Sequence, residues 1–204
     1  MEGRAIPVTQ YRWIYPQDTS QQFTVFKAIN ASGKLVARPH LADLACEWCG
    51  RVDETKALQR PIEVGTRIRL KRDLIGSFDL QPLISLRMEA ALTELAPGAI
   101  DTYPIIDNVG YRAVAPKRIL TPSPSDPAFR FTDRCGRCSR FRDIVCKGAP
   151  AVEPDLEFAA FNLETRVGRF LAWFASLDLV TRLQSIKPTL KGVYFDPDVF
   201  AARP

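Results

Sequence analysis

Histidine and methionine are scarce in this sequence. Its 204 residues include a single histidine, His40, and two methionines. The patterns H-E-x-x-H, G-x-S-x-G and the Walker-type glycine loop do not occur either, so the common zinc-hydrolase, acyl-transfer and phosphate-handling sites have no support. Acidic residues are scattered through the chain, and no pair of them is singled out. The sequence therefore predicts a protein that is not an enzyme.

Long apolar runs are also missing. The first thirty residues contain no run of signal-peptide length, and no later stretch approaches the roughly 18 to 20 residues that cross a bilayer. We therefore expect a soluble, cytoplasmic protein without membrane contact.

Charge of one sign does not dominate. The chain carries 28 basic and 23 acidic residues, a formal net charge of +5, which describes a mixed surface and selects no class of partner. A hydrophobic content of 46% is enough for one substantial core. We expect a single domain over residues 1–204, of the α/β or α+β class, with a mixed sheet.

Cysteine is the informative residue type. The chain has five, and four of them form two CxxC pairs, Cys46/Cys49 and Cys135/Cys138, which is typical of a metal site in a reducing compartment. Two intervening residues let a tight turn aim both sulfurs at one point, while turn amides stabilise the thiolates. We predict zinc knuckles at 46–50 and 135–139 that share one Zn²⁺ across the 85 intervening residues.

Other interpretations of these residues remain open. The pairs can be two separate redox dithiols, or simply small buried apolar side chains. Cys146 is expected to be a spare buried thiol, because four ligands fill a structural zinc site. His40, six residues before Cys46, is either a further ligand or, as we favour, a packed or surface residue.

Several segments have a recognisable local pattern. Residues 62–70 alternate apolar and polar side chains, which predicts a half-buried strand, and a second strand is expected around Phe23 and Val25. Three prolines in 120–128 predict an exposed Pro-rich loop that leads to the second cysteine pair.

A weak internal similarity relates residues 83–97 to 174–188. Each copy is predicted to form a strand, a short helix and a strand, with Ser85 and Ser176 as helix N-caps and Pro97 and Pro188 just past the helix ends. The alternatives are a duplicated unit and a chance likeness between two amphipathic helices. In both cases the apolar faces belong to the core.

The second cysteine pair also suggests a rival function. Residues 129–142 interleave five arginines with three phenylalanines, a pattern that fits phosphate contacts and base stacking on a zinc-supported nucleic-acid surface. We favour the alternative, in which the phenylalanines pack under the knuckle and the arginines extend to solvent, because no basic track continues elsewhere in the chain.

Three sequence features together resemble one family. They are Pro39-His40 before Cys46-Glu-Trp-Cys49-Gly50, the late Cys135-Gly-Arg-Cys138, and Leu190-Lys-Gly-Val-Tyr-Phe-Asp-Pro197 followed by Val199-Phe200. In these features the chain is similar to the double-CxxCG motif proteins, a paralogous group abundant in myxobacteria and associated with toxin immunity. The clearest departure is Ser139, where the second motif of the family has glycine.

The resemblance implies a zinc-stabilised immunity protein that neutralises a cognate bacterial toxin by binding it in the cytoplasm. Such a protein needs a stable scaffold and a complementary surface, and it needs no catalytic site.

Overall fold

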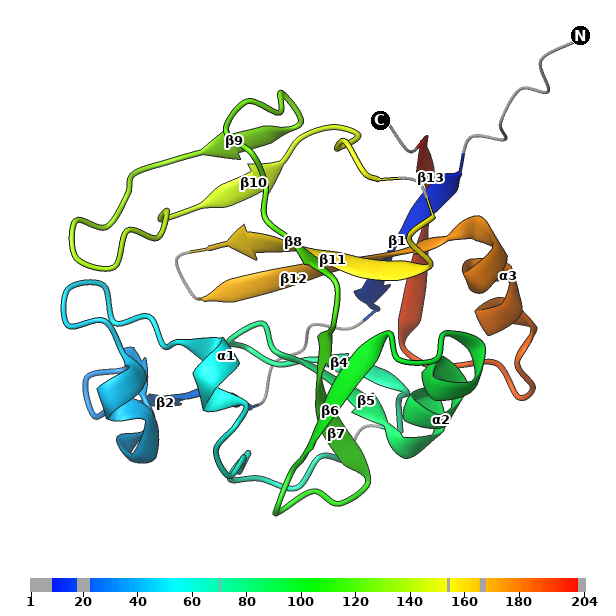
Figure 1. Ribbon diagram of the computed structural model, residues 1–204. Helices are drawn as coiled ribbons and strands as arrows, with labels where there is room; N and C mark the ends of the chain where they lie inside the picture. Colours follow the sequence, from blue (N-terminus) through cyan, green and yellow to red (C-terminus); the bar gives the residue numbers. More distant parts are fainter. Residues whose placement is uncertain (1–8, 18–22, 70, 154, 166–167, 202–204) are drawn as a thin grey trace, which may run out of the picture.

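Two stacked β-sheets and two helices form the body of the molecule in the computed structural model, which describes residues 9–17, 23–69, 71–153, 155–165 and 168–201 (Figure 1). The larger sheet has the order β13 (Val193–Ala201), β1 (Gln10–Pro16), β12 (Arg169–Ser176), β11 (Phe158–Glu164), β8 (Ile119–Leu120). Its neighbours are antiparallel except β11 and β8, which are parallel, so the sheet is mixed. The fold is therefore α+β with a mixed sheet, as predicted.

The smaller sheet repeats the arrangement of the larger one. Its antiparallel order is β4 (Leu74–Gly76), β5 (Pro82–Ser85), β7 (Tyr111–Pro116), β6 (Ile100–Pro104). A helix follows β5 and leads to β6, and a helix follows β12 and leads to β13, with one antiparallel strand between the two in each sheet. That intervening strand is β7 in one sheet and β1 in the other, so the units share a spatial order but differ in chain order.

The two helices begin where the serines predict. The Ser85 hydroxyl accepts from the amide of Met88 at the start of α2 (Leu86–Leu95), and the Ser176 hydroxyl accepts from the amide of Leu179 at the start of α3 (Leu177–Ser185). Both helices end shortly before their proline. The two predicted strand-helix-strand units are thus confirmed. The apolar faces of both helices lie in the core, as expected, but Leu86 at the first position of α2 is 45% exposed.

The central core lies between the two sheets. The alternating strand residues Leu74, Ile84 and Val114 of the small sheet meet Ile14, Trp173 and other residues of the large sheet. The helices α2 and α3 close one end of this layer side by side (Figure 1), and they contribute the buried residues Met88, Ala91, Leu92, Leu179, Val180 and Leu183.

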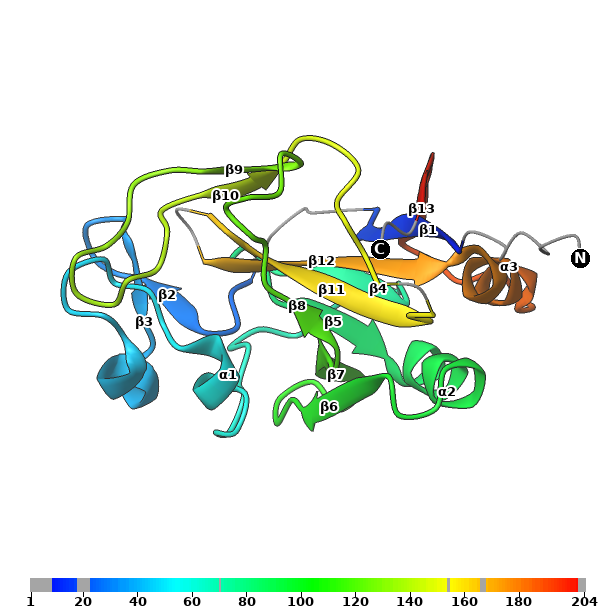
Figure 2. The same cartoon turned by 45° about the horizontal axis from the view of Figure 1, so that its top comes forward.

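Each sheet has a second apolar face, and a different segment covers each one. Residues 23–64, with β2 (Lys27–Ile29), β3 (Leu35–Ala37), the short 3-10 helix η1 (Pro39–Leu44) and α1 (Glu54–Ala57), pack on the small sheet. The hairpin β9 (Phe129–Phe131) and β10 (Ile144–Cys146) packs on the large sheet. Figure 2 shows these two coverings converging at the end of the molecule opposite α2 and α3.

Residues 62–69 form no strand, contrary to our prediction, and residue 70 lies outside the described residues. Ile62 and Val64 are buried between exposed neighbours, so the alternation predicts burial correctly. No strand forms because the side chains of two residues accept hydrogen bonds from the backbone amides of this segment, in place of a neighbouring strand. Asp107 accepts from Val64 and Gly65, and Asn108 accepts from Ile68.

The strand expected around Phe23 and Val25 begins later, at Lys27. Asp79, in the turn between β4 and β5, is the reason. Its carboxylate accepts from the amides of Val25, Phe26 and Lys27 over distances of 2.6 to 3.0 Å, and from the Ser77 hydroxyl. This carboxylate therefore fastens the first covering segment to the small sheet.

The Pro-rich segment follows the sequence prediction in its backbone. Residues 121–128 contain no helix or strand and are mostly exposed, although Pro122 and Ala128 are buried. No helix within the described residues is long and apolar enough to cross a membrane.

We predict that Asp79→Ala lowers the free energy of unfolding by about 3 kcal/mol, because three buried amides lose a charged acceptor. Urea unfolding measures the change. The matched control is Asp101→Ala, whose exposed ion pair with Lys117 contributes less than about 1 kcal/mol. Equal effects of the two substitutions would contradict the role given to Asp79.

Candidate metal centre

The two CxxC turns have the same backbone geometry. The Cys46 amide donates to the Arg51 carbonyl at 2.8 Å, and the Gly50 amide donates to the Cys46 carbonyl at 2.8 Å. The equivalent bonds in the second turn run from Cys135 to Arg140 and from Ser139 to Cys135, each 2.9 Å long. Both turns are therefore one structural motif that occurs twice.

The residue after each CxxC pair has a backbone conformation that favours glycine. Gly50 has a φ of +68° and Ser139 a φ of +59°, so both occupy the left-handed region that favours glycine. Ser139 makes the same turn hydrogen bond as Gly50, although a side chain in this backbone conformation costs conformational energy.

The four sulfurs converge on one point. The Sγ atoms of Cys46 and Cys135 are 3.9 Å apart, those of Cys49 and Cys138 are 3.7 Å apart, and all four lie within 4.8 Å of one another. A tetrahedral metal with bonds of about 2.3 Å to sulfur requires sulfurs about 3.8 Å apart, whereas a disulfide needs about 2.05 Å. The cluster can therefore hold a metal ion, and all five cysteines are free thiols.

The turns also favour thiolate at the first cysteine of each pair. Backbone hydrogen bonds from Cys138 and Arg137 lower the pKa of Cys135 to about 6, and those from Cys49 and Trp48 lower the pKa of Cys46. Desolvation and the neighbouring thiols raise the pKa of Cys49 to about 12. Four sulfurs this close cannot all carry negative charge without a cation, which a divalent metal supplies.

The cluster joins two segments that cover different sheets. The first pair lies between η1 and α1, on the covering of the small sheet, and the second lies at the tip of the hairpin between β9 and β10, on the covering of the large sheet (Figures 1 and 2). A shared metal would therefore fix both coverings to each other, as well as closing the long chain loop between them.

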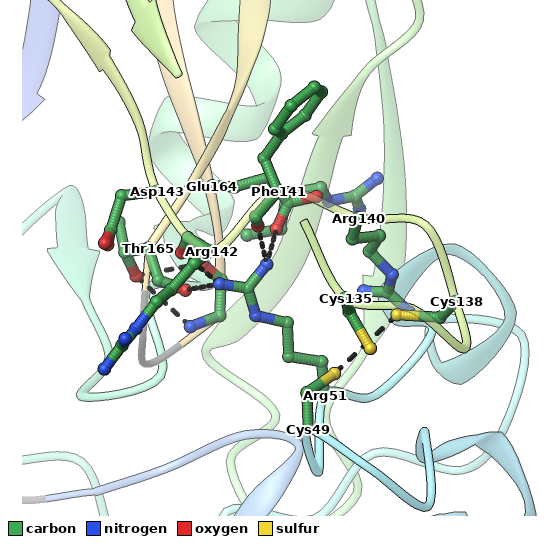
Figure 3. A network of polar contacts seen from close by, with 12 residues as sticks. Cys49, Arg51, Cys135, Cys138, Arg140, Phe141, Arg142, Asp143, Glu164 and Thr165 are labelled. Carbon is green, nitrogen blue, oxygen red and sulfur yellow. Dashed lines mark hydrogen bonds and ion pairs between the residues drawn. The ribbon is translucent and has the colours of Figure 1, made fainter. Parts of the chain in front are cut away.

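An arginine follows each CxxC turn and crosses to the opposite one. The Arg51 side chain, which is 5% exposed, forms a 3.0 Å ion pair with Glu164 at the end of β11. Its guanidinium also donates to the carbonyls of Phe141, Arg142 and Thr165, as Figure 3 shows. Arg51 thus fastens the first turn to the second turn and to the large sheet.

Arg140 makes the reciprocal contacts. It donates to the Val52 carbonyl at 2.9 Å and pairs with the buried Glu54 carboxylate at 3.3 Å. Each arginine therefore bonds the carbonyl of the residue that follows the other arginine, and each meets a buried glutamate. Burial raises the pKa of Glu164, and the Arg51 charge opposes that shift.

Our sequence analysis did not identify these arginines as part of the site. The signal was present, because Cys46 to Arg51 and Cys135 to Arg140 share the spacing Cys-x-x-Cys-x-Arg. Comparing the two motifs with each other, beyond their cysteines, would have found it. The glutamate partners carry no such signal, since Glu164 is 113 residues from Arg51 and reaches it only through the fold.

The remaining candidates lie outside the sulfur cluster. Among the described residues, the cluster of side chains that could hold a metal consists of the four cysteines of the CxxC pairs. It includes neither His40, which is exposed on η1, nor Cys146. The Cys146 thiol donates to the Gly148 carbonyl and is partly buried.

The phenylalanines of the second segment pack inward. Phe129 is buried in the outer core of the large sheet, and Phe131 packs edge-on against Phe141 with ring centres 4.9 Å apart. Arg130, Arg134, Arg137 and Arg142 are exposed. This is the arrangement that we favoured over aromatic rings available for base stacking, except that the fifth arginine, Arg140, turns inward to Glu54.

Comparisons of the whole chain gave no match to any protein-family model, curated protein or solved structure. The geometry of the two turns therefore has to carry the functional interpretation.

We predict that Arg51→Lys lowers the free energy of unfolding of the metal-loaded protein by about 2 kcal/mol, because a single ammonium cannot replace the forked contacts to three carbonyls and Glu164. Arg140→Lys should have a smaller effect, because its side chain is 25% exposed.

Arg142→Lys is the matched control, since the Arg142 side chain is 50% exposed. Chemical denaturation at fixed metal concentration provides the measurement. A change at Arg51 no larger than the change at Arg142 would show that the reciprocal contacts do not hold the two turns together.

Proposed function

We propose that this chain is a non-enzymatic binding protein whose two CxxC turns share one structural zinc ion. The observation that carries the proposal is the sulfur cluster, in which Cys46, Cys49, Cys135 and Cys138 lie within 4.8 Å of one another at spacings that suit a tetrahedral metal.

The donor set supports a structural role for the metal. Four thiolates fill the tetrahedral coordination of zinc and leave no position for a reacting water. Iron accepts the same four-sulfur geometry, so the choice of zinc rests on its prevalence in redox-inert four-cysteine sites that join separate segments. A colourless protein with one zinc per chain is the expected form.

The proposed partner is a protein toxin, which the chain would neutralise by binding in the cytoplasm. This part of the proposal rests on the resemblance to the double-CxxCG motif proteins. It is supported by the shared turn geometry at Gly50 and Ser139, because both positions adopt the backbone conformation that the glycine of that motif provides.

Metal loss should unfold the coverings of both sheets. We predict that Cys46→Ser and Cys135→Ser each reduce bound zinc severalfold and lower the melting temperature of the protein, because metal binding and folding are coupled. Inductively coupled plasma mass spectrometry and calorimetry on the same samples measure the two quantities.

Cys146→Ser is the matched control, because its sulfur lies outside the cluster. It should retain one zinc per chain and the parental melting temperature. A Cys46→Ser, Cys135→Ser double variant as stable as the parent would contradict the shared site.

The toxin-binding part needs its own test. The chain is expected to form a tight one-to-one complex with the toxin encoded beside its gene, as measured by calorimetric titration and co-purification, and to suppress the growth defect that this toxin causes. Growth inhibition that persists despite equal expression of the chain would contradict the immunity role.

A further inference from the structure

A cavity of about 480 Å³ opens between the two CxxC turns. Trp48 and Cys49 line it from the first turn, and Arg134, Cys135, Gly136 and Arg142 line it from the second segment. We propose that this cavity and its rim form a docking surface for a carboxylate-rich segment of a partner protein. This inference deepens the proposed function, on which it rests, by naming the surface that contacts the partner.

The charge of the rim selects an acidic occupant. Arg134 is exposed, its Nε donates to the Ser139 carbonyl, and it forms no ion pair with a described carboxylate. Arg142 is half exposed, and its only ion pair is the weak 3.6 Å contact with Asp133, an 82% exposed side chain that is the one carboxylate in the cavity lining. Arg137, between the cysteines of the second pair, is exposed and likewise has no described carboxylate partner.

The inner arginines of the cavity wall are in a different state. Arg51 and Arg140 also line the cavity, but each is neutralised by a buried glutamate. Their charges hold the turns together and are not available to a ligand. The accessible positive charge at this site is therefore that of Arg134 and Arg142 in the cavity lining, together with Arg137, which follows the lining residue Gly136 in the sequence. Their guanidinium groups can form forked bonds with carboxylates.

Trp48 supplies the apolar part of the surface. It is 72% exposed, more than nearly every other large apolar side chain of the described residues. The second turn approaches it closely, since a Cβ atom at position 136 would lie 3.3 Å from its ring. Gly136 thus lets the indole rest on the second turn with its other side open, and exposed tryptophan beside arginine is the composition of interface hot spots.

The same features disfavour a nucleic acid as occupant. Only two accessible guanidinium groups line the cavity, those of Arg134 and Arg142. Two such groups match a short run of carboxylates, whereas a continuous phosphate backbone is bound by a longer basic track. One side of the Trp48 ring is also covered by the second turn, and the nearby phenylalanines pack inward.

Binding of a defined acidic probe tests the inference. The metal-loaded chain is titrated with fluorescent poly-L-glutamate in low salt, and with a thymidine oligonucleotide of matched charge. We expect Arg134→Glu to weaken poly-L-glutamate binding at least tenfold and Trp48→Ala at least threefold. Arg67→Glu, an exposed arginine outside the cavity, makes the same change in charge and should weaken binding less than twofold.

Three outcomes would overturn the proposal: equal losses from Arg134→Glu and Arg67→Glu, tighter Arg134-dependent binding of the oligonucleotide, or an Arg134-dependent dimer of the chain itself. If the Arg134→Glu variant loses its metal, the double variant Arg137→Glu, Arg142→Glu replaces it in the test. The same tenfold loss of poly-L-glutamate binding is expected from this double variant.

Metal content of the parent protein tests the proposed function separately. One zinc per chain together with binding that ignores Arg134 overturns the docking surface and leaves the metal centre standing. A metal-free parent whose poly-L-glutamate binding depends on Arg134 would overturn the metal centre and leave the docking surface standing.

Discussion

The convergence of four sulfurs at the ends of two distant segments is the contact on which the arrangement of this molecule depends. Each sheet buries one face against the other and leaves its second face to a covering with little regular structure of its own. Short hairpins and single helical turns are marginal by themselves. Joining the two coverings at their tips lets each one restrain the other, and a tetrahedral metal held by the four sulfurs would give that junction a fixed geometry.

The reciprocal arginines extend the junction into the body of the protein. A nearly buried guanidinium such as that of Arg51 is tolerated only with a full set of partners, because an unpaired charge in the interior is costly. Its partners come from the second turn and from the end of β11, and those of Arg140 come from the first turn and α1. The cysteine cluster and the sheets therefore share one network of contacts, and a defect in either should destabilise the other.

Local signals in the sequence predicted much of this structure. Two-residue spacing between cysteines, serine before a helix and proline after it each act within a few residues, so the CxxC turns and the strand-helix-strand units were recognisable. The prediction of a strand over 62–70 was wrong because Asp107 and Asn108, some forty residues away in the sequence, accept the hydrogen bonds of its backbone amides. The late start of β2 has the same kind of cause in Asp79. Side-chain acceptors supplied by distant loops leave no periodic pattern, and neither do the glutamate partners of the arginines.

X-ray absorption at the metal edge of the purified protein, combined with metal quantification, tests the shared centre most directly. One zinc per chain surrounded by four sulfurs at about 2.3 Å, with all five thiols reduced after denaturation, is the predicted result. A metal-free protein, or one in which each CxxC pair closes as its own disulfide, would contradict the shared centre and separate the two turns that it is proposed to unite.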